Sequence, residues 1–204
     1  MTQPFRSLSG AALAIAIAGA AVQLGAQARL SVRDADRFQS KLAQIAAFGV
    51  TPARAKAARS TPVTDAEVNS YLKYRAADQI PVGIVNPILT AVGNGRVSGR
   101  ALVDLDAVRT QKKRGWTDPM GYLTGKLPVT AVGTLATDNG VGRFQLESAA
   151  ISGVTIPKAV LQELLSYYSR TPEKPSGINM DDPFELPARI REIRVQQGTA
   201  LVIQ

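Results

Sequence analysis

Alternation of apolar and polar residues in the middle of the chain constrains its fold more than any other sequence feature. Residues 96–109, 126–137 and 141–151 each repeat with a period of two, which is typical of β-strands with one buried face. Gly93-Asn94-Gly95 precedes the first stretch and Asp138-Asn139-Gly140 separates the last two, and both tripeptides are tight-turn signals. The pattern therefore predicts an antiparallel meander sheet.

Two further segments extend the predicted β-structure. Residues 80–92 also alternate, but Pro81 and Pro87 interrupt the pattern, which favours an edge strand or a bulged strand. Near the end of the chain, a strand over residues 184–195 and a turn at Gln197-Gly198 predict a closing hairpin. We expect a bulge in the first strand of this hairpin because the alternation slips there.

Helical spacing is found before and after these strands. Apolar residues recur every three or four positions over residues 29–49, and Thr64–Glu67 fits a capping box that starts a second, short helix. Residues 50–62 are small, basic and interrupted by proline, so we expect a loop there. A third helix is predicted over 157–170, with Pro157 at its first position. The apolar stripe of this helix consists of Val160, Leu161, Leu164, Leu165 and Tyr168.

The order of these elements lacks the strand–helix–strand alternation of a parallel sheet. The predicted fold class is α+β, in which a curved antiparallel meander sheet wraps the helix at 157–170 and the other helices are N-terminal. We expect a single sheet-and-helix domain over residues 64–204, preceded by an N-terminal helix and linker over residues 29–63.

The N-terminus has the layout of a secretory signal peptide, which we predict over residues 1–28. Arg6 precedes the apolar run Ala11–Leu24, and Ala26-Gln27-Ala28 fits a small-x-small cleavage site. The apolar run is short for a membrane span, which favours cleavage over a retained anchor. We therefore expect export to the periplasm or another extracytoplasmic compartment.

Composition excludes several kinds of chemistry. The 204 residues include no His and no Cys, which excludes a Ser-His-Asp triad, a thiol nucleophile and metal sites that use these ligands. The close carboxylate pairs are Asp104/Asp106 and Asp181/Asp182, which we interpret as a solvated strand face and a polar turn. A cation or acid–base site at Asp104/Asp106 is the less favoured reading. We expect no enzyme activity, no cofactor and no bound metal.

The chain is basic, with 24 Lys+Arg, 16 Asp+Glu and a net charge of +8. Anionic surfaces are therefore candidate partners, and general solubility is the alternative explanation of the charge. Nucleic acid is a poor candidate for an exported protein. The densest basic cluster lies beside the single Trp, in a predicted loop. Cations next to amphipathic rings are typical of a membrane-surface contact, and an ordinary exposed turn is the alternative. The predicted contact residues are Lys112, Lys113, Arg114, Trp116 and Tyr122.

The inward positions of the predicted strands are small or branched. Small side chains leave room for an apolar groove between the sheet and the helix at 157–170, but the pattern alone favours a filled core. The strand positions concerned are Ala101, Val103, Leu105, Val129, Ala131, Leu135, Phe144 and Leu146.

Several segments together resemble a family. Gly95–Leu105, Gly153-Val154-Thr155-Ile156-Pro157 and Pro183-Phe184-Glu185-Leu186-Pro187, followed by Ile190–Val195, are similar to the closing module of LmeA-like and YpmS-like extracytoplasmic proteins. The resemblance covers roughly residues 64–204. These proteins are regarded as relatives of the tubular lipid-binding (TULIP-like) fold, in which a long curved sheet wraps a helix and encloses an apolar cavity.

The resemblance favours the groove over the filled core. It implies that the strand positions and the helix stripe named above line a site for acyl chains. It also implies a phospholipid or another acyl lipid as the partner, in lipid transport or envelope maintenance, and no catalytic residue. The alternative is a periplasmic structural or protein-interaction module with a filled core and no ligand, which binds a protein through a sheet edge.

Overall fold

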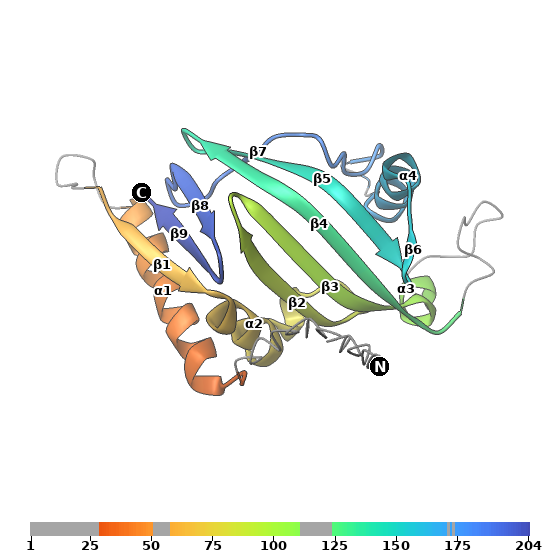
Figure 1. Cartoon of the computed structure of the whole chain (residues 1–204), viewed down its shortest axis with the longest axis horizontal. Coiled ribbons are helices and arrows are strands. Elements are labelled where there is room, and N and C mark those ends of the chain that lie inside the picture. The colour runs from red at the N-terminus through yellow and green to blue at the C-terminus, as the bar shows by residue number, and fades with distance from the viewer. Residues whose placement is uncertain (1–28, 51–57, 111–123, 171, 173) are drawn as a thin grey trace, which may run out of the picture.

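The structure is a computed structural model that describes residues 29–50, 58–110, 124–170, 172 and 174–204. Two antiparallel sheets and four α-helices make up this part of the chain (Figure 1). The predicted signal peptide at 1–28 lies outside the described residues, and so does the predicted membrane contact formed by Lys112, Lys113, Arg114, Trp116 and Tyr122.

The larger sheet is the predicted meander, with strand order β2-β3-β4-β5-β6, and β7 also pairs with β5. Its strands are antiparallel and do not close into a barrel, which confirms the α+β class and the antiparallel meander. The bounds are β2 Ile84–Gly93, β3 Arg96–Asp104, β4 Lys126–Asp138, β5 Val141–Ile151, β6 Val154–Thr155 and β7 Phe184–Glu185.

The smaller sheet has the strand order β1-β9-β8. It therefore pairs a strand from the N-terminal third of the chain with the C-terminal hairpin. Its strands are β1 Ser60–Thr64, β8 Glu192–Gln196 and β9 Thr199–Ile203. The prediction of a loop over 50–62 is therefore wrong for Ser60–Pro62. Pro62 is compatible with this strand because β1 lies at the edge of the sheet, where a missing N–H costs no ladder bond.

Helices flank the sheets at both ends. The long helix α1, Val32–Val50, confirms the prediction over 29–49, and α4, Lys158–Tyr168, confirms the helix predicted over 157–170. Pro157 precedes α4 as its N-cap residue instead of occupying its first turn. The remaining helices are α2, Asp65–Tyr74, the 3₁₀ turn Ala77–Gln79 and α3, Leu105–Thr110.

Helix α3 corrects the strand predicted over 96–109, which ends at Asp104. The Asp104 carboxylate accepts a hydrogen bond from the N–H of Ala107 at 3.0 Å, as an N-terminal cap does, and this ends the strand. Leu105 is then the first helical residue and is only 3% exposed. Asp106 lies on the helix and accepts from the N–H of Gly125, so Asp104 and Asp106 do not share a solvated strand face.

The strand predicted over 184–195 is also corrected. Residues 184–185 form β7 against β5, and residues 192–196 form β8 in the other sheet. Between them, Ala188 and Arg189 have φ values of +54° and +56°, and two successive residues in the left-handed region interrupt the extended backbone. The interruption predicted within this segment is real, but it separates two strands instead of forming a bulge within one.

The main buried core lies between the smaller sheet and α1. Ile45 of α1 packs with Leu186 and Ile190, and Ala188, Ile193 and Val202 pack around them. Gly49 is required here because a Cβ at this position would lie 2.7 Å from the Cα of Ala188. The core therefore depends on close contact between the backbone of α1 and the backbone of residues 186–190.

Candidate functional site

The pairing register places the alternating residues of the larger sheet on two distinct faces. Val129, for example, pairs with Ala101 and Ile151, and Ala131 pairs with Gly99 and Ala149. Paired residues in an antiparallel sheet project from the same face. One face of β3–β5 is thus apolar except for Thr137 at one end, and it consists of Val97, Gly99, Ala101, Val103, Leu127, Val129, Ala131, Gly133, Leu135, Thr137, Gly142, Phe144, Leu146, Ala149 and Ile151.

We call this surface the apolar sheet face. Seven of the eight predicted strand positions lie on it, namely Ala101, Val103, Val129, Ala131, Leu135, Phe144 and Leu146. Leu105 does not, because it belongs to α3. The sequence pattern therefore identified the face correctly, and the role of these residues in binding a ligand stays a prediction.

The opposite face of the same strands is mixed, with charged side chains among apolar ones such as Leu102 and Val132. Arg96, Arg100 and Arg143 project from it and are exposed. Glu147 receives a hydrogen bond from the Thr134 hydroxyl at 2.6 Å and an ion pair from Arg96 at 2.9 Å, and these interactions lower the pKa of its carboxyl. The difference between the two faces marks the apolar one as the side that an apolar layer is expected to cover.

No described helix or strand overlaps the middle of β3 and β4 in Figure 1, on either side of the sheet. The ends of the sheet are covered instead. At one end, the Phe184 ring lies over Gly142, and two hydrogen bonds join Thr137 to the backbone of Ile193 in β8. In the middle, Val129 and Ala101 are only half-buried.

Helix α4 lies beside β5 at the far end of the sheet (Figure 1). Leu161, Leu164 and Leu165 of its apolar stripe are half-buried, and Val160 is exposed; Tyr168 is the last residue of α4. The sheet does not close around this helix. Polar contacts hold α4 to the following loop, because Lys158 forms an ion pair with Asp181 at 2.6 Å and Gln162 bonds Ile178 and Met180.

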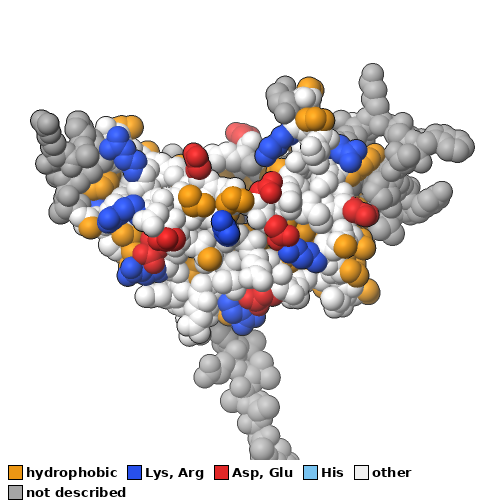
Figure 2. All heavy atoms as spheres, turned by 90° about the horizontal axis from the view of Figure 1, so that it is seen from above, with side chains coloured by type: hydrophobic (Ala, Val, Ile, Leu, Met, Phe, Trp, Pro, Cys, Tyr) orange, Lys and Arg blue, Asp and Glu red, His pale blue; other side chains and the backbone are white. Residues whose placement is uncertain are grey.

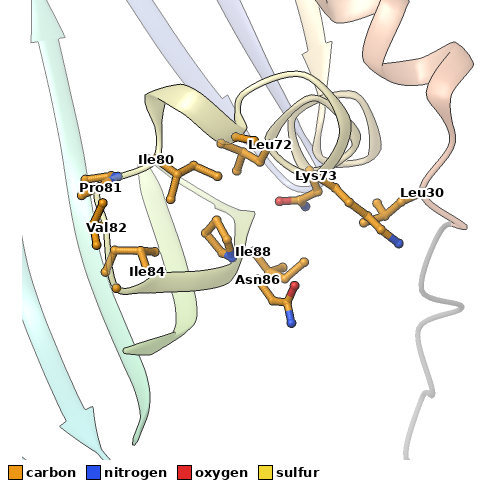
Figure 3. A pocket seen from close by; sticks show the side chains of 13 residues that line it. Leu30, Leu72, Lys73, Ile80, Pro81, Val82, Ile84, Asn86 and Ile88 are labelled. Carbon is orange, nitrogen blue, oxygen red and sulfur yellow. The ribbon is translucent and has the colours of Figure 1, made fainter. Parts of the chain in front are cut away.

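A cavity of about 600 Å³ lies elsewhere, between α2 and the start of β2 (Figure 3). None of the residues predicted to line a ligand site contributes to it. We call it the α2 groove. Most of the described residues that line it are apolar and one is charged, while polar and apolar atoms contribute about equally to the exposed wall. The lining residues are Leu30, Asn69, Leu72, Lys73, Ala77, Ile80, Pro81, Val82, Gly83, Ile84, Asn86, Pro87 and Ile88.

The wall of the α2 groove follows from an irregularity in β2. The register shifts between Val85 and Ile88, and Asn86 between them has a φ of +50°. Pro87 has no N–H to give to the ladder, so the strand bulges there, as the two prolines of this segment predicted. Their interrupted alternation was the one sequence signal for this cavity.

Charged side chains are dispersed in the described part of the chain. Among the described residues, no group of three or more acidic side chains is placed to hold a metal ion. Viewed as in Figure 2, Lys and Arg intermingle with Asp and Glu instead of gathering in one patch. No helix within the described ranges is long and apolar enough to cross a membrane.

Comparisons with known proteins give one distant likeness. No protein-family model matches the chain, and no curated protein matches its sequence. A solved structure described as the crystal structure of lipopolysaccharide binding protein aligns with 14% sequence identity and a TM-score of 0.22. The alignment covers 71% of this chain and 40% of that chain. Because so low a TM-score does not establish a common fold, what that protein binds is not transferred to this chain.

Proposed function

We propose that this protein is a non-enzymatic lipid binder that holds acyl chains against its apolar sheet face. The observation that carries the proposal is a sheet with one face that is apolar except for Thr137 at one end, and with no described layer over its middle. Soluble proteins rarely leave such a surface in water unless something binds there. Each methylene group that leaves water on this face contributes about 0.8 kcal/mol, so a single acyl chain needs no polar anchor.

The proposal includes export and a role at an envelope. It is supported by the apolar run Ala11–Leu24 and the small-x-small motif at Ala26-Gln27-Ala28, which are typical of a signal peptide. The basic and aromatic cluster from Lys112 to Tyr122 would bring the protein to anionic lipid head groups. Acyl chains would then pass from a membrane to the apolar sheet face.

The test is the lipid content of the purified full chain, measured by organic extraction and mass spectrometry. Ala131→Glu places a charge on the apolar sheet face, and Thr130→Glu places the same charge on the opposite, exposed face of the same strand. We expect bound acyl lipid in the wild type and in Thr130→Glu, and its loss in Ala131→Glu. Absence of lipid from the wild type, or equal lipid in both variants, would contradict the proposal.

A protein-interaction module is the second candidate, and one observation favours it. Along its outer edge β5 pairs with β7 only at residues 141–142 and with β6 only at residues 150–151. The middle of β5 has no strand on that side within the described chain, and such an edge accepts an added strand from a partner. Gln145 points its carbonyl toward Gly133 of β4, so its neighbour Phe144 directs its N–H to the open edge. Phe144→Pro removes that N–H, and Phe144→Ala removes the same ring but keeps it. Equal lipid content in the two variants, with protein binding lost only in Phe144→Pro, would favour this candidate.

A further inference from the structure

We propose that the α2 groove is a second binding site, separate from the apolar sheet face, for a single-chain amphiphile with an anionic head group, of the fatty-carboxylate class. The two surfaces share no residue of β3, β4 or β5. The proposal therefore does not depend on the function proposed above, and either can fail alone.

The size and lining of the groove fit such a ligand. A volume of about 600 Å³ falls within the range of small-molecule sites, which are mostly apolar with a few polar groups. Figure 3 shows Leu72 and Ile80 on one side of the cavity, Ile84 and Ile88 on the other. Nine of the thirteen lining residues are Leu, Ile, Val, Ala or Pro, which suits a hydrocarbon chain.

The charge of the lining selects the head group. Among the described residues, Lys73 is the one charged residue that lines the groove, and no acidic residue lines it. Its side chain extends toward Leu30 in Figure 3 and is exposed, so its ammonium stays hydrated while a chain lies below. The Asn69 side chain does not change this selection, because its amide nitrogen and oxygen both already bond the backbone of Leu89.

The groove is held open before any ligand arrives. On one side, Asn69 and Asp65 of α2 bond the backbone of Leu89 and Ala91 in β2 at 2.7–3.0 Å. On the other, Gly83 lies against Val108 of α3, and its carbonyl accepts from the N–H of Asp104 at 2.7 Å. Because both walls are fixed to neighbouring elements, binding orders little of the chain, which favours affinity.

The first experiment uses the full chain with Ala131→Glu, which removes the acyl site proposed on the apolar sheet face. This variant is titrated with dodecanoate, decanoate, dodecanol and dodecyltrimethylammonium by isothermal titration calorimetry. We expect dodecanoate to bind more tightly than dodecanol and the cationic probe to bind most weakly. Affinity should fall about fourfold for each methylene removed from the buried chain. Equal affinity for the anionic, neutral and cationic probes would overturn the assignment of an anionic head group.

The second experiment tests the role of Lys73. Lys73→Met should weaken dodecanoate binding about two- to fivefold, the size of an exposed ion pair, and leave dodecanol binding unchanged. Lys158→Met removes the same charge from α4, which contributes no residue to the groove, and should change neither. Equal losses in the two variants would overturn the proposed contact, because they would reflect net charge alone.

The third experiment locates the chain. Added to Ala131→Glu, Ala77→Trp fills the groove and should abolish the remaining binding of both dodecanoate and dodecanol, whereas Ala131→Glu alone should retain it. Circular dichroism checks that each variant folds. If Ala77→Trp does not fold, Val82→Glu replaces it, because Val82 also lines the groove and is exposed. Binding that survives both groove variants, or that only Ala131→Glu removes, would overturn the proposal.

Discussion

The ammonium of Lys41 in α1 lies 2.7 and 2.8 Å from the two carboxylate oxygens of Glu67 in α2. The same carboxylate accepts from the N–H of Thr64, and the Thr64 hydroxyl accepts from the N–H of Glu67, which completes the predicted capping box. Glu67 is only 6% exposed. The pair therefore joins the N-terminal helix to the start of the helix that forms one wall of the α2 groove.

Lys41→Met should destabilise the protein by about 2 kcal/mol, because it leaves the buried carboxylate of Glu67 without its cation. Chemical denaturation monitored by circular dichroism measures the change. Arg37→Met is the matched control on the same helix, since Arg37 forms an exposed ion pair with Asp34 at 3.1 Å. The control should change stability by less than about 0.5 kcal/mol, and equal effects would contradict the structural role of the pair.

Acid should weaken this junction. Burial acts to raise the pKa of Glu67, but the hydrogen bonds from Lys41 and the Thr64 backbone outweigh it, so the pKa is lowered from its usual 4.5. A carboxyl group with a lowered folded-state pKa stabilises the fold above its unfolded-state pKa and loses that contribution as the pH falls through the folded-state value. In denaturation series between pH 6 and pH 3, Glu67→Gln should show a shallower loss of stability below about pH 4.5 than the wild type. A slope identical to that of the wild type would count against the assignment.

Gly83→Ala should destabilise the protein by about 2–3 kcal/mol. Gly83 has a φ of +89°, and a Cβ there would clash with Val108 and lie 3.0 Å from the carbonyl oxygen of Asp104. Gly153 provides the control, since its φ is +81° but a Cβ would meet nothing within 4 Å. Gly153→Ala thus measures backbone strain alone, about 1 kcal/mol. Similar melting temperatures for the two variants would show that Gly83 makes no close contact.

Asn69→Ala should loosen the edge of β2. Asn69 is 7% exposed, and its side chain bonds the N–H and the carbonyl of Leu89, so its loss leaves two backbone groups without partners. We expect a loss of about 2 kcal/mol. Amide hydrogen exchange should become faster at Leu89 than at Ala91, whose N–H is held by Asp65 instead. Equal acceleration at the two amides would point to global unfolding and contradict this account.

The large sheet could be predicted from sequence because strand alternation is a local property. The spacing of Val129, Ala131 and Leu135 places them on one face whatever surrounds them, and the Asn-Gly turns set the pairing of β4 with β5. The capping box at Thr64 was predictable for the same reason, since its two residues lie three positions apart.

Leu105 shows where local reasoning ends. Leu105 continues the alternation of β3, yet the side chain of Asp104 caps a helix that begins at Leu105. The Leu105 side chain is therefore buried instead of lying on the sheet face. The α2 groove was equally invisible, because its walls come from Leu30, from α2 and from the bulge at Asn86, which are separated by tens of residues. The prolines near Asn86 indicated the bulge, but not what would face it.

By itself, the sequence determined the α+β class, the meander and the identity of the residues on its apolar face, because periodicity and turns act over a few residues. Only the tertiary structure decided that Ser60–Thr64 pairs with Thr199–Ile203 and that α1 packs on this second sheet through Ile45 and Leu186. It also decided that the middle of the meander has no described layer over it. The β1–β9 pairing and the contact of Ile45 with Leu186 join residues more than a hundred positions apart. Their free energy comes from burial and shape complementarity, which no local pattern encodes.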